Sequence, residues 1–314
     1  MKGLKTLLVL ALGLCIIPAV CAKEGGDQYP FGAENWFTGA TPPPGLTFIN
    51  YAGYYSGELK NSYGGTALIN GAPAKVDASW DALRFVEMTN YKFLGADWGM
   101  HIIIPGVTQS INMGGEGERR NVYGLGDITV DPFVLGWHHP QWHMVTAFDV
   151  DLPTGHYIQD DPRTSIGAHY YSFEPLICFS YMPKTGWEAS IKLMYNMKTT
   201  NGDTNYHSGQ EFHTDYVAGK HVGRWMLGAS GYALKQTTAD TVNGVTVPAA
   251  FGIYDQGREG QVIALGPTVG YEAKNHIMFN LHWQHEMEVR NRFGGEKVWF
   301  KLIVPITISP AKKS

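Results

Sequence analysis

The chain has 314 residues and a net charge of −4, with 17% charged residues, 13% aromatic residues and 38 glycines. Charged residues make up about 25% of an average soluble protein, so this chain is poor in charge. Its 44% apolar content argues against disorder, its three cysteines against a disulfide scaffold, and its negative charge against nucleic-acid binding.

The N-terminus has the pattern of a secretory signal peptide. Two lysines precede an apolar run over residues 7–20, which ends in the small-residue pattern Val20-Cys21-Ala22. The run is shorter than the ~20 residues that a transmembrane helix needs. We expect a signal peptide over residues 1–22, cleaved after Ala22. The mature chain then keeps Cys178 as its single thiol, so disulfides do not hold it together.

Apolar and polar residues alternate with a period of two through the rest of the chain, which indicates β-strands. In one such run, Ile277, Phe279 and Leu281 alternate with polar residues such as Asn280 and His282. About twelve runs of this kind lie between residues 49 and 307. Three of them contain a proline, which removes a hydrogen-bond donor from the sheet, so we expect local bulges at Pro132, Pro175 and Pro267.

Short and long connections alternate between these runs. The short ones lie near residues 93–95, 137–139, 182–185, 219–221 and 272–274, and the longer ones near 60–81, 107–125, 152–168, 197–204, 236–260 and 288–296. This order is typical of outer-membrane barrels, which have short periplasmic turns and longer outer loops. A sheet in hydrocarbon must close, because no strand edge can stay unpaired there.

The sequence therefore predicts an all-β protein, a transmembrane antiparallel up-and-down β-barrel of about 12 strands with both termini periplasmic. An irregular N-terminal periplasmic arm or plug is expected over residues 23–47, the barrel over 48–308 and a C-terminal tail over 309–314. The alternative is a secreted soluble β-sandwich that binds a ligand or partner. The abundance of Trp, Tyr and Phe on the apolar faces favours the barrel.

Strand parity divides the side chains between the lumen and the membrane. The polar parity gives these lumen-lining candidates: Arg84, Asp127, Asp131, Asp149, Asp151, Glu174, Lys192, His207, Glu211, His213, Asp215, His282, Glu286 and Lys301. The tryptophans expected at the membrane interfaces are Trp137, Trp142, Trp187, Trp225 and Trp283. Charges of both signs in a lumen narrower than that of a 16-stranded porin suggest a selective, gated or mostly closed passage.

Two histidine-rich stretches are candidate sites for chemistry. His138, His139 and His143 could bind a metal, but their neighbours favour an interfacial turn. His207 shares a strand face with Glu211, His213 and Asp215, and neighbouring pairs of these side chains could hold an ion. A polar lumen wall fits this face better. We predict no catalytic residues, no metal and no cofactor; a barrel-type lipid acyl hydrolase is the enzymatic alternative.

Several short stretches carry a resemblance to a known family. They are Pro42-Pro43-Pro44-Gly45 with Asn50-Tyr51, Gly124-Leu125-Gly126-Asp127 with Asp131-Pro132, Asp149-Val150-Asp151-Leu152-Pro153-Thr154-Gly155-His156-Tyr157, Thr185-Gly186-Trp187-Glu188, Ser208-Gly209 with Phe212-His213, and Gly266-Pro267. These resemble the outer-membrane protein family named for the meta-cleavage pathway of phenol degradation. The resemblance covers residues 40 to 300 and implies a barrel associated with uptake of aromatic compounds.

We therefore predict a bacterial outer-membrane protein, exported through its signal peptide, that acts as a passive channel or transporter for small aromatic or hydrophobic compounds. Its expected partners are outer-membrane lipids, lipopolysaccharide and a small-molecule substrate that the sequence does not identify. No nucleic acid is expected to bind.

Overall fold

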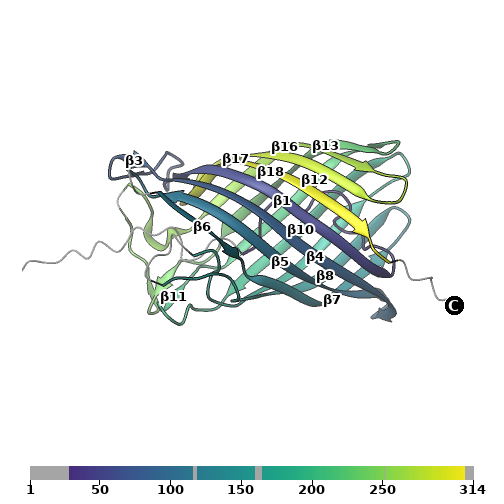
Figure 1. The fold of residues 1–314 in the computed structure, drawn as a ribbon, viewed down its shortest axis with the longest axis horizontal. Helices are drawn as coiled ribbons and strands as arrows, with labels where there is room; N and C mark the ends of the chain where they lie inside the picture. Colours follow the sequence, from purple (N-terminus) through teal and green to yellow (C-terminus); the bar gives the residue numbers. More distant parts are fainter. Residues whose placement is uncertain (1–27, 116–118, 160–164, 251, 308–314) are drawn as a thin grey trace, which may run out of the picture.

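The structure is a computed structural model that describes residues 28–115, 119–159, 165–250 and 252–307. The predicted signal peptide and the predicted tail lie outside these residues. Long antiparallel strands, tilted relative to a common axis, wind around it and form a barrel (Figure 1). The wall strands are β1 (Gly45–Lys60), β4 (Lys75–Phe93), β5 (Ala96–Asn112), β6 (Arg119–Leu125), β7 (Ile128–His138), β8 (Trp142–Leu152), β9 (Ser172–Tyr181), β10 (Trp187–Lys198), β12 (Glu211–Val222), β13 (Trp225–Gln236), β16 (Gln261–Glu272), β17 (Met278–Arg290) and β18 (Arg292–Pro305).

The wall closes because its first strand pairs with both the second and the last. β1 pairs with β18 from Thr47 opposite Pro305 to Lys60 opposite Arg292, and its other edge pairs with β4. β6 and β7 both pair with β5 and form the two halves of one wall strand. The result is a closed antiparallel 12-strand barrel, as the alternation predicted. The alternative β-sandwich is wrong, because the wall is one closed sheet and not two stacked sheets.

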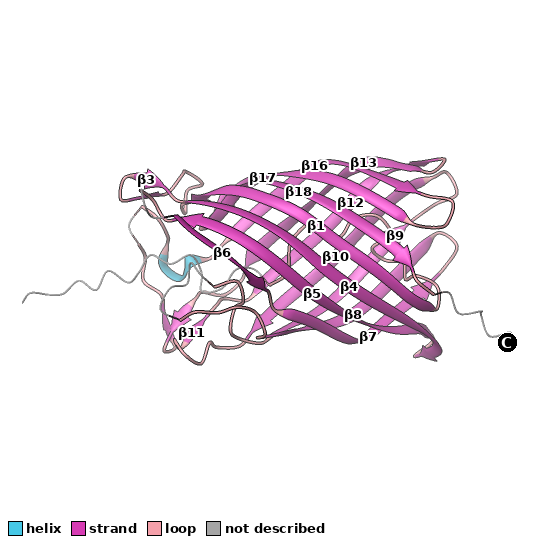
Figure 2. Ribbon diagram, viewed as in Figure 1, coloured by secondary structure: helices cyan, strands magenta, loops and turns pink. Residues whose placement is uncertain are grey.

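Strands dominate the structure, and the remaining elements are short (Figure 2). They lie in the connections: β2 (Leu68–Ile69), β3 (Ala72–Pro73), β11 (Tyr206–His207), β14 (Thr241–Val242), β15 (Val245–Thr246) and the 3₁₀ turn η2 (Gln256–Arg258). Among the described residues, no helix has both the length and the apolar character needed to cross a bilayer.

The two ends of the barrel differ in the length of their connections. β1 begins and β18 ends at the end that carries the short turns, while β3 and β11 lie at the opposite, long-loop end (Figure 1). Which membrane side each end faces stays a prediction. Three predicted loops are wrong in extent. β4 begins inside the expected 60–81 loop, and β5 and β6 both extend into the expected 107–125 loop. In the expected 288–296 loop, Asn291, in the left-handed conformation (φ 52°), alone separates β17 from β18.

Alternation along the strands separates an inner from an outer face. On β9, residues such as Glu174 and Cys178 are buried, while Ile177 and Phe179, on either side of Cys178, are exposed. Across the wall the exposed set is apolar and includes Phe148, Ile191, Phe212, Leu227, Leu265, Leu281 and Phe300. This outward apolar face is what a lipid-exposed barrel requires.

A bulge at Pro132 interrupts this alternation on β7. The pairing of β7 with β8 shifts between Val130 and Leu135, because proline offers no N–H to the ladder. The Asp131 carboxylate accepts the N–H groups of Phe133 and Phe148, both at 2.6 Å. Beyond the bulge the parity reverses. Alternation counted along this strand predicts Val134 on the outward face with Ile128 and Val130, and this prediction is wrong: Val134 is buried, while Phe133 is exposed.

The other two prolines do not repeat this feature. Pro175 pairs opposite Phe148 on β8, and Pro267 pairs opposite Ala229 on β13, with no register shift at either position. The expected bulge is thus confirmed at Pro132 and wrong at Pro175 and Pro267.

Replacing Asp131 with alanine should destabilise the barrel. Two main-chain N–H groups would lose a charged acceptor, and the expected loss is about 2–4 kcal/mol in the free energy of unfolding. Urea unfolding of the refolded protein in detergent, followed on a gel where folded and unfolded barrels migrate differently, measures this. Asp131→Asn keeps an acceptor oxygen and should lose less. The control Asp203→Ala removes a loop carboxylate. An Asp131→Ala midpoint equal to that of the control would contradict this account of the bulge.

Candidate functional site

The segment Gln28–Pro44, here called the plug, runs through the lumen before β1 begins. It has no regular secondary structure beyond turns, so its buried peptide groups need partners elsewhere. The Asp215 carboxylate of β12 is the partner of two peptide groups and one side chain of the plug. It accepts the Tyr29 hydroxyl at 2.7 Å, the Gly32 N–H at 2.8 Å and the Glu34 N–H at 3.1 Å.

Further anchors follow the plug toward the short-turn end. The Phe37 N–H donates to the Glu188 carboxylate at 2.6 Å, and the Gly39 N–H donates to the Ser180 hydroxyl at 2.8 Å. At the other end of the plug, the Gln28 amide donates to Asp127 at 2.8 Å. Wall groups along much of the lumen therefore replace the hydrogen bonds that an irregular chain cannot make with itself.

His282 also binds the plug, with a defined hydrogen-bond arrangement. Its Nδ1 lies 3.1 Å from the Asn35 amide nitrogen, and its Nε2 lies 2.9 Å from the Gly32 carbonyl oxygen. The amide nitrogen donates and the carbonyl accepts, so the neutral ring carries its proton on Nε2. The imidazole thereby bonds to one donor and one acceptor of the plug.

Glu34 brings a plug carboxylate to a cluster of wall cations. Its Oε1 accepts from Arg84 at 2.9 Å and from the Tyr51 hydroxyl at 2.8 Å, and its Oε2 pairs with Lys301 at 3.1 Å. Burial favours protonation, but the charges of Lys301, Arg84 and Lys192 outweigh it and hold the pKa of this carboxyl well below its usual range. Glu34 is therefore an anion held inside the barrel.

His101, Asp131 and Asp149 form the one group among the described residues whose His, Cys, Asp and Glu ligand atoms lie close enough to share a metal ion. His101 places Nδ1 2.9 Å from Arg84 and Nε2 3.1 Å from an Asp149 oxygen. Arginine can only donate, so Nδ1 accepts and the neutral ring carries its proton on Nε2. No ring lone pair then remains for a metal. The group acts as a polar network that positions Arg84.

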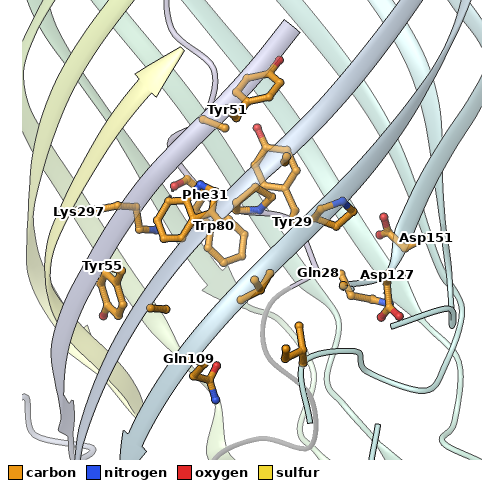
Figure 3. A pocket seen from close by; sticks show the side chains of 18 of the residues that line it. Gln28, Tyr29, Phe31, Tyr51, Tyr55, Trp80, Gln109, Asp127, Asp151 and Lys297 are labelled. Carbon is orange, nitrogen blue, oxygen red and sulfur yellow. Dashed lines mark hydrogen bonds between the residues drawn. The ribbon is translucent and has the colours of Figure 1, made fainter. Parts of the chain in front are cut away.

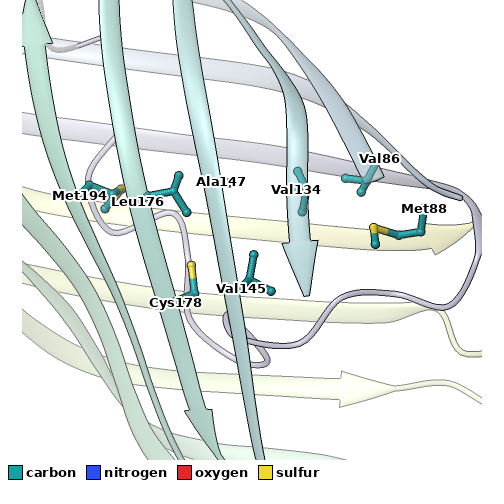
Figure 4. Close-up of a cluster of buried hydrophobic side chains, with 8 residues drawn as sticks. All are labelled: Val86, Met88, Val134, Val145, Ala147, Leu176, Cys178 and Met194. Atoms are coloured by element: carbon teal, nitrogen blue, oxygen red, sulfur yellow. The ribbon is translucent and has the colours of Figure 1, made fainter. Parts of the chain in front are cut away.

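Two cavities lie in the lumen on opposite sides of this network. The cavity toward the long loops has a volume of about 330 Å³, and its wall includes Tyr29, Phe31, Tyr51 and Trp80 (Figure 3). The cavity toward the short turns has a volume of about 500 Å³. Its wall includes the buried cluster of Val86, Met88, Val134, Val145, Ala147, Leu176 and Cys178 (Figure 4).

Glu34, Arg84 and Lys192 line both cavities. They therefore form the polar partition between two largely apolar chambers. Sequence parity predicted a polar lumen, and the apolar lining toward the short turns differs from that prediction. One reason is the bulge, which turns Val134 inward.

The structure brings most of the predicted lumen residues together inside the barrel. The buried ones are Asp127, Asp131, Asp149, Asp151, Glu174, Lys192, Glu211, His213, Asp215, His282, Glu286 and Lys301. Arg84 is half-buried between the cavities. His213 pairs with Glu174 at 3.0 Å, and Glu211 pairs with Lys198 at 2.6 Å. His207 differs, because it lies in the short strand β11, outside the barrel sheet.

The predicted interface tryptophans lie mostly at one end. Trp137, Trp142, Trp187 and Trp225 lie at or next to the strand ends that border short turns, whereas Trp283 lies in the middle of β17. The nearby histidines do not converge on one point. His138 approaches His143, with 3.1 Å between their Nδ1 atoms, while His139 stacks on Trp142.

Sequence reasoning missed the plug residues and His101. Glu34 and Tyr29 fall in an irregular stretch, where no parity rule assigns a direction. His101 could have been found, because it alternates with Gly99 on β5 and both are buried. Glu188 could also have been found, because its alternation with Ser190 on β10 points it inward.

The chain has clear likenesses among solved structures. The COG4313 outer membrane channel from Pseudomonas putida F1 superimposes with a TM-score of 0.69 at 11% identity, over 86% of this chain and 98% of that chain. The translocator domain of the autotransporter NalP from Neisseria meningitidis (TM-score 0.48, 9% identity, 84% of this chain and 90% of that chain) fits less closely. The CymD monoaromatic hydrocarbon channel (0.39, 8%, 83% and 88%) fits less closely still.

The likeness to the COG4313 channel shows that the two chains share the barrel fold. No curated protein matches the chain in sequence. A family model with the description "Putative MetA-pathway of phenol degradation" matches residues 56–302, which is most of the barrel. The chain therefore belongs to this family, as the resemblance of its short motifs implied.

Proposed function

We propose that this protein is a passive outer-membrane channel for small hydrophobic or aromatic molecules. The observation that carries the proposal is the pair of cavities arranged in series along the lumen, each with a mostly apolar surface. A pore for sugars or ions would offer polar groups along its whole length. Here aromatic and aliphatic side chains such as Trp80, Ile103 and Val145 line chambers of about 330 and 500 Å³, within the range of small-molecule sites.

The fold and the outer surface support the same proposal. The structure resembles a solved outer membrane channel, and an apolar band covers the outward face of the wall. We infer that the short turns face the periplasm, as in other outer-membrane barrels, with lipid around the wall and lipopolysaccharide beside the long loops. Both termini of the mature chain would then be periplasmic, after export through the signal peptide.

Passage requires the plug to move, because Glu34 and its cation partners separate the two cavities. The plug is held mainly by hydrogen bonds and ion pairs from single side chains, and each of these contributes only a few kcal/mol. The plug can therefore detach locally while the wall stays intact. Its contacts set selectivity and gating, and the concentration gradient of the solute drives the flux.

Expression of the protein should increase entry of a hydrophobic aromatic probe into cells with intact lipopolysaccharide. N-phenyl-1-naphthylamine is suited to this test, because it fluoresces once it leaves water. We expect about tenfold faster uptake than in cells with an empty vector, which corresponds to a barrier lower by about 1.4 kcal/mol. Val145→Trp fills the short-turn cavity and should abolish the increase. Uptake equal to the empty vector, with folded barrel present in the outer membrane, would refute the channel.

Weakening the plug should expose the buried thiol of Cys178. This residue is 4% exposed and lines the short-turn cavity. Asp215→Asn weakens three contacts to the plug, and the loss of ~1.4 kcal/mol or more should speed reaction with a small water-soluble methanethiosulfonate about tenfold. Mass spectrometry of the labelled protein measures the rate.

Asp240→Asn is the matched control for that experiment. Asp240 is also buried and accepts from the Gly209 N–H at 2.7 Å and the Gln236 amide at 2.8 Å, but it does not contact the plug. Its replacement should leave the labelling rate of Cys178 unchanged. Equal rates for both variants would show that the plug does not guard the cavity.

A further inference from the structure

Three cations from separate wall strands meet in the middle of the lumen. Arg84 comes from β4, Lys192 from β10 and Lys301 from β18, and all three act on the Glu34 carboxylate. Buried positive charges are costly unless anions neutralise them. The one anion that the plug contributes here is Glu34, which divides its two oxygens between Arg84 and Lys301.

Lys192 has less compensation than its two neighbours. It is 5% exposed, and its Nζ lies 4.3 Å from the centre of the Tyr29 ring. The carboxylates of Asp149, Glu174 and Glu34 act on it electrostatically. Within the part of the chain that the structure describes, none of them forms an ion pair with Nζ. A buried ammonium with this geometry points to an anion that can approach it from a cavity.

The surroundings define what kind of anion fits. Lys192 and Arg84 line both cavities, and the rings of Tyr29, Tyr51 and Trp80 stand in the wall of the long-loop cavity (Figure 3). A flat apolar body would therefore lie against aromatic rings while its charged end reaches the cations. The way Glu34 is bound shows that two cations and the Tyr51 hydroxyl can hold a carboxylate here.

The acidic groups nearby limit the charge of such a ligand. Asp149 faces His101, Glu174 faces His213, and Asp215 is occupied by plug donors. These carboxylates already have partners, but they repel further negative charge. A monoanion fits this balance better than a dianion such as phosphate.

We propose that Arg84, Lys192 and Lys301 form a binding site for the carboxylate of a small aromatic acid, and that Glu34 occupies this site until the ligand displaces it. The inference rests on the proposed function, and names a substrate class for the same lumen. Glu34 acts as an internal competitor. Binding of the acid removes the ion pairs that hold the centre of the plug, so ligand entry and plug release become one exchange of carboxylates.

Calorimetric titration of the purified full chain in a non-ionic detergent tests this, with sodium benzoate as the probe and benzamide as its neutral isostere. We expect benzoate to bind at least about tenfold more tightly than benzamide, and added salt to weaken benzoate binding alone. Equal affinities for the two probes, or no benzoate binding, would overturn the proposal on the unmodified protein.

Two variants should change benzoate affinity in opposite directions. Lys192→Met removes a cation and should weaken binding about tenfold, whereas Glu34→Gln removes the competitor and should strengthen it by a similar factor. Lys220→Met, at an exposed position on β12, controls for loss of one positive charge and should have no effect. Weaker or unchanged binding in Glu34→Gln would overturn the competitor role.

Glu188→Gln distinguishes two effects: removal of the Glu34 carboxylate from the cation site, and general loosening of the plug. It weakens the contact to the Phe37 N–H without touching the three cations. It should therefore strengthen benzoate binding less than Glu34→Gln does, and an equal gain would overturn the exchange. The probe-uptake experiment stays independent. Rapid entry of the neutral probe without benzoate binding refutes only this site, and benzoate binding without probe uptake refutes only the channel.

Discussion

A strand that crosses hydrocarbon has no water to bond with its peptide groups, so every strand edge in the wall must pair. The ladder between β1 and β18 meets this requirement, and it also fixes the size of the interior. Twelve tilted strands enclose a lumen too wide for side chains alone to fill and narrower than a general porin. One additional segment of chain fits into that space, and the plug occupies it. Closure of a twelve-stranded wall therefore creates the space in which an irregular segment can be held.

The plug and the polar interior depend on each other. Inward carboxylates such as Asp215 and Glu188 would be costly if buried without donors, and the plug supplies main-chain N–H groups to both. Glu34 in turn needs Arg84 and Lys301. Hydrogen bonds and ion pairs thus join wall and plug in both directions, because neither part satisfies its polar groups alone. The low charge content of the chain is consistent with this, since much of the charge on the strands is used inside the barrel.

The sequence predicts the barrel wall much better than it predicts the candidate site. Period-two alternation predicts strands and directions wherever pairing is regular, and it places residues such as Asp149 and Glu174 inside. It fails at Pro132, because a bulge adds a residue whose effect on parity depends on the neighbouring strands. It also fails for Glu34 and Tyr29, because an irregular segment takes its path from the wall groups that accept it. Those groups come from β4, β12 and β18, which lie far apart in the chain.

Two apolar cavities joined by a polar partition place opposite demands on a solute. An apolar molecule fits either chamber, but it offers the cations no replacement partner, so it crosses only while the plug is detached. Separating Glu34 from Arg84 and Lys301 without a replacement would leave buried charges unpaired, which costs several kcal/mol. A solute that brings its own carboxylate avoids most of that cost, because the cations exchange one partner for another. Selectivity then comes from the free energy needed to separate Glu34 from its cations. The two cavities hold the solute before and after that step.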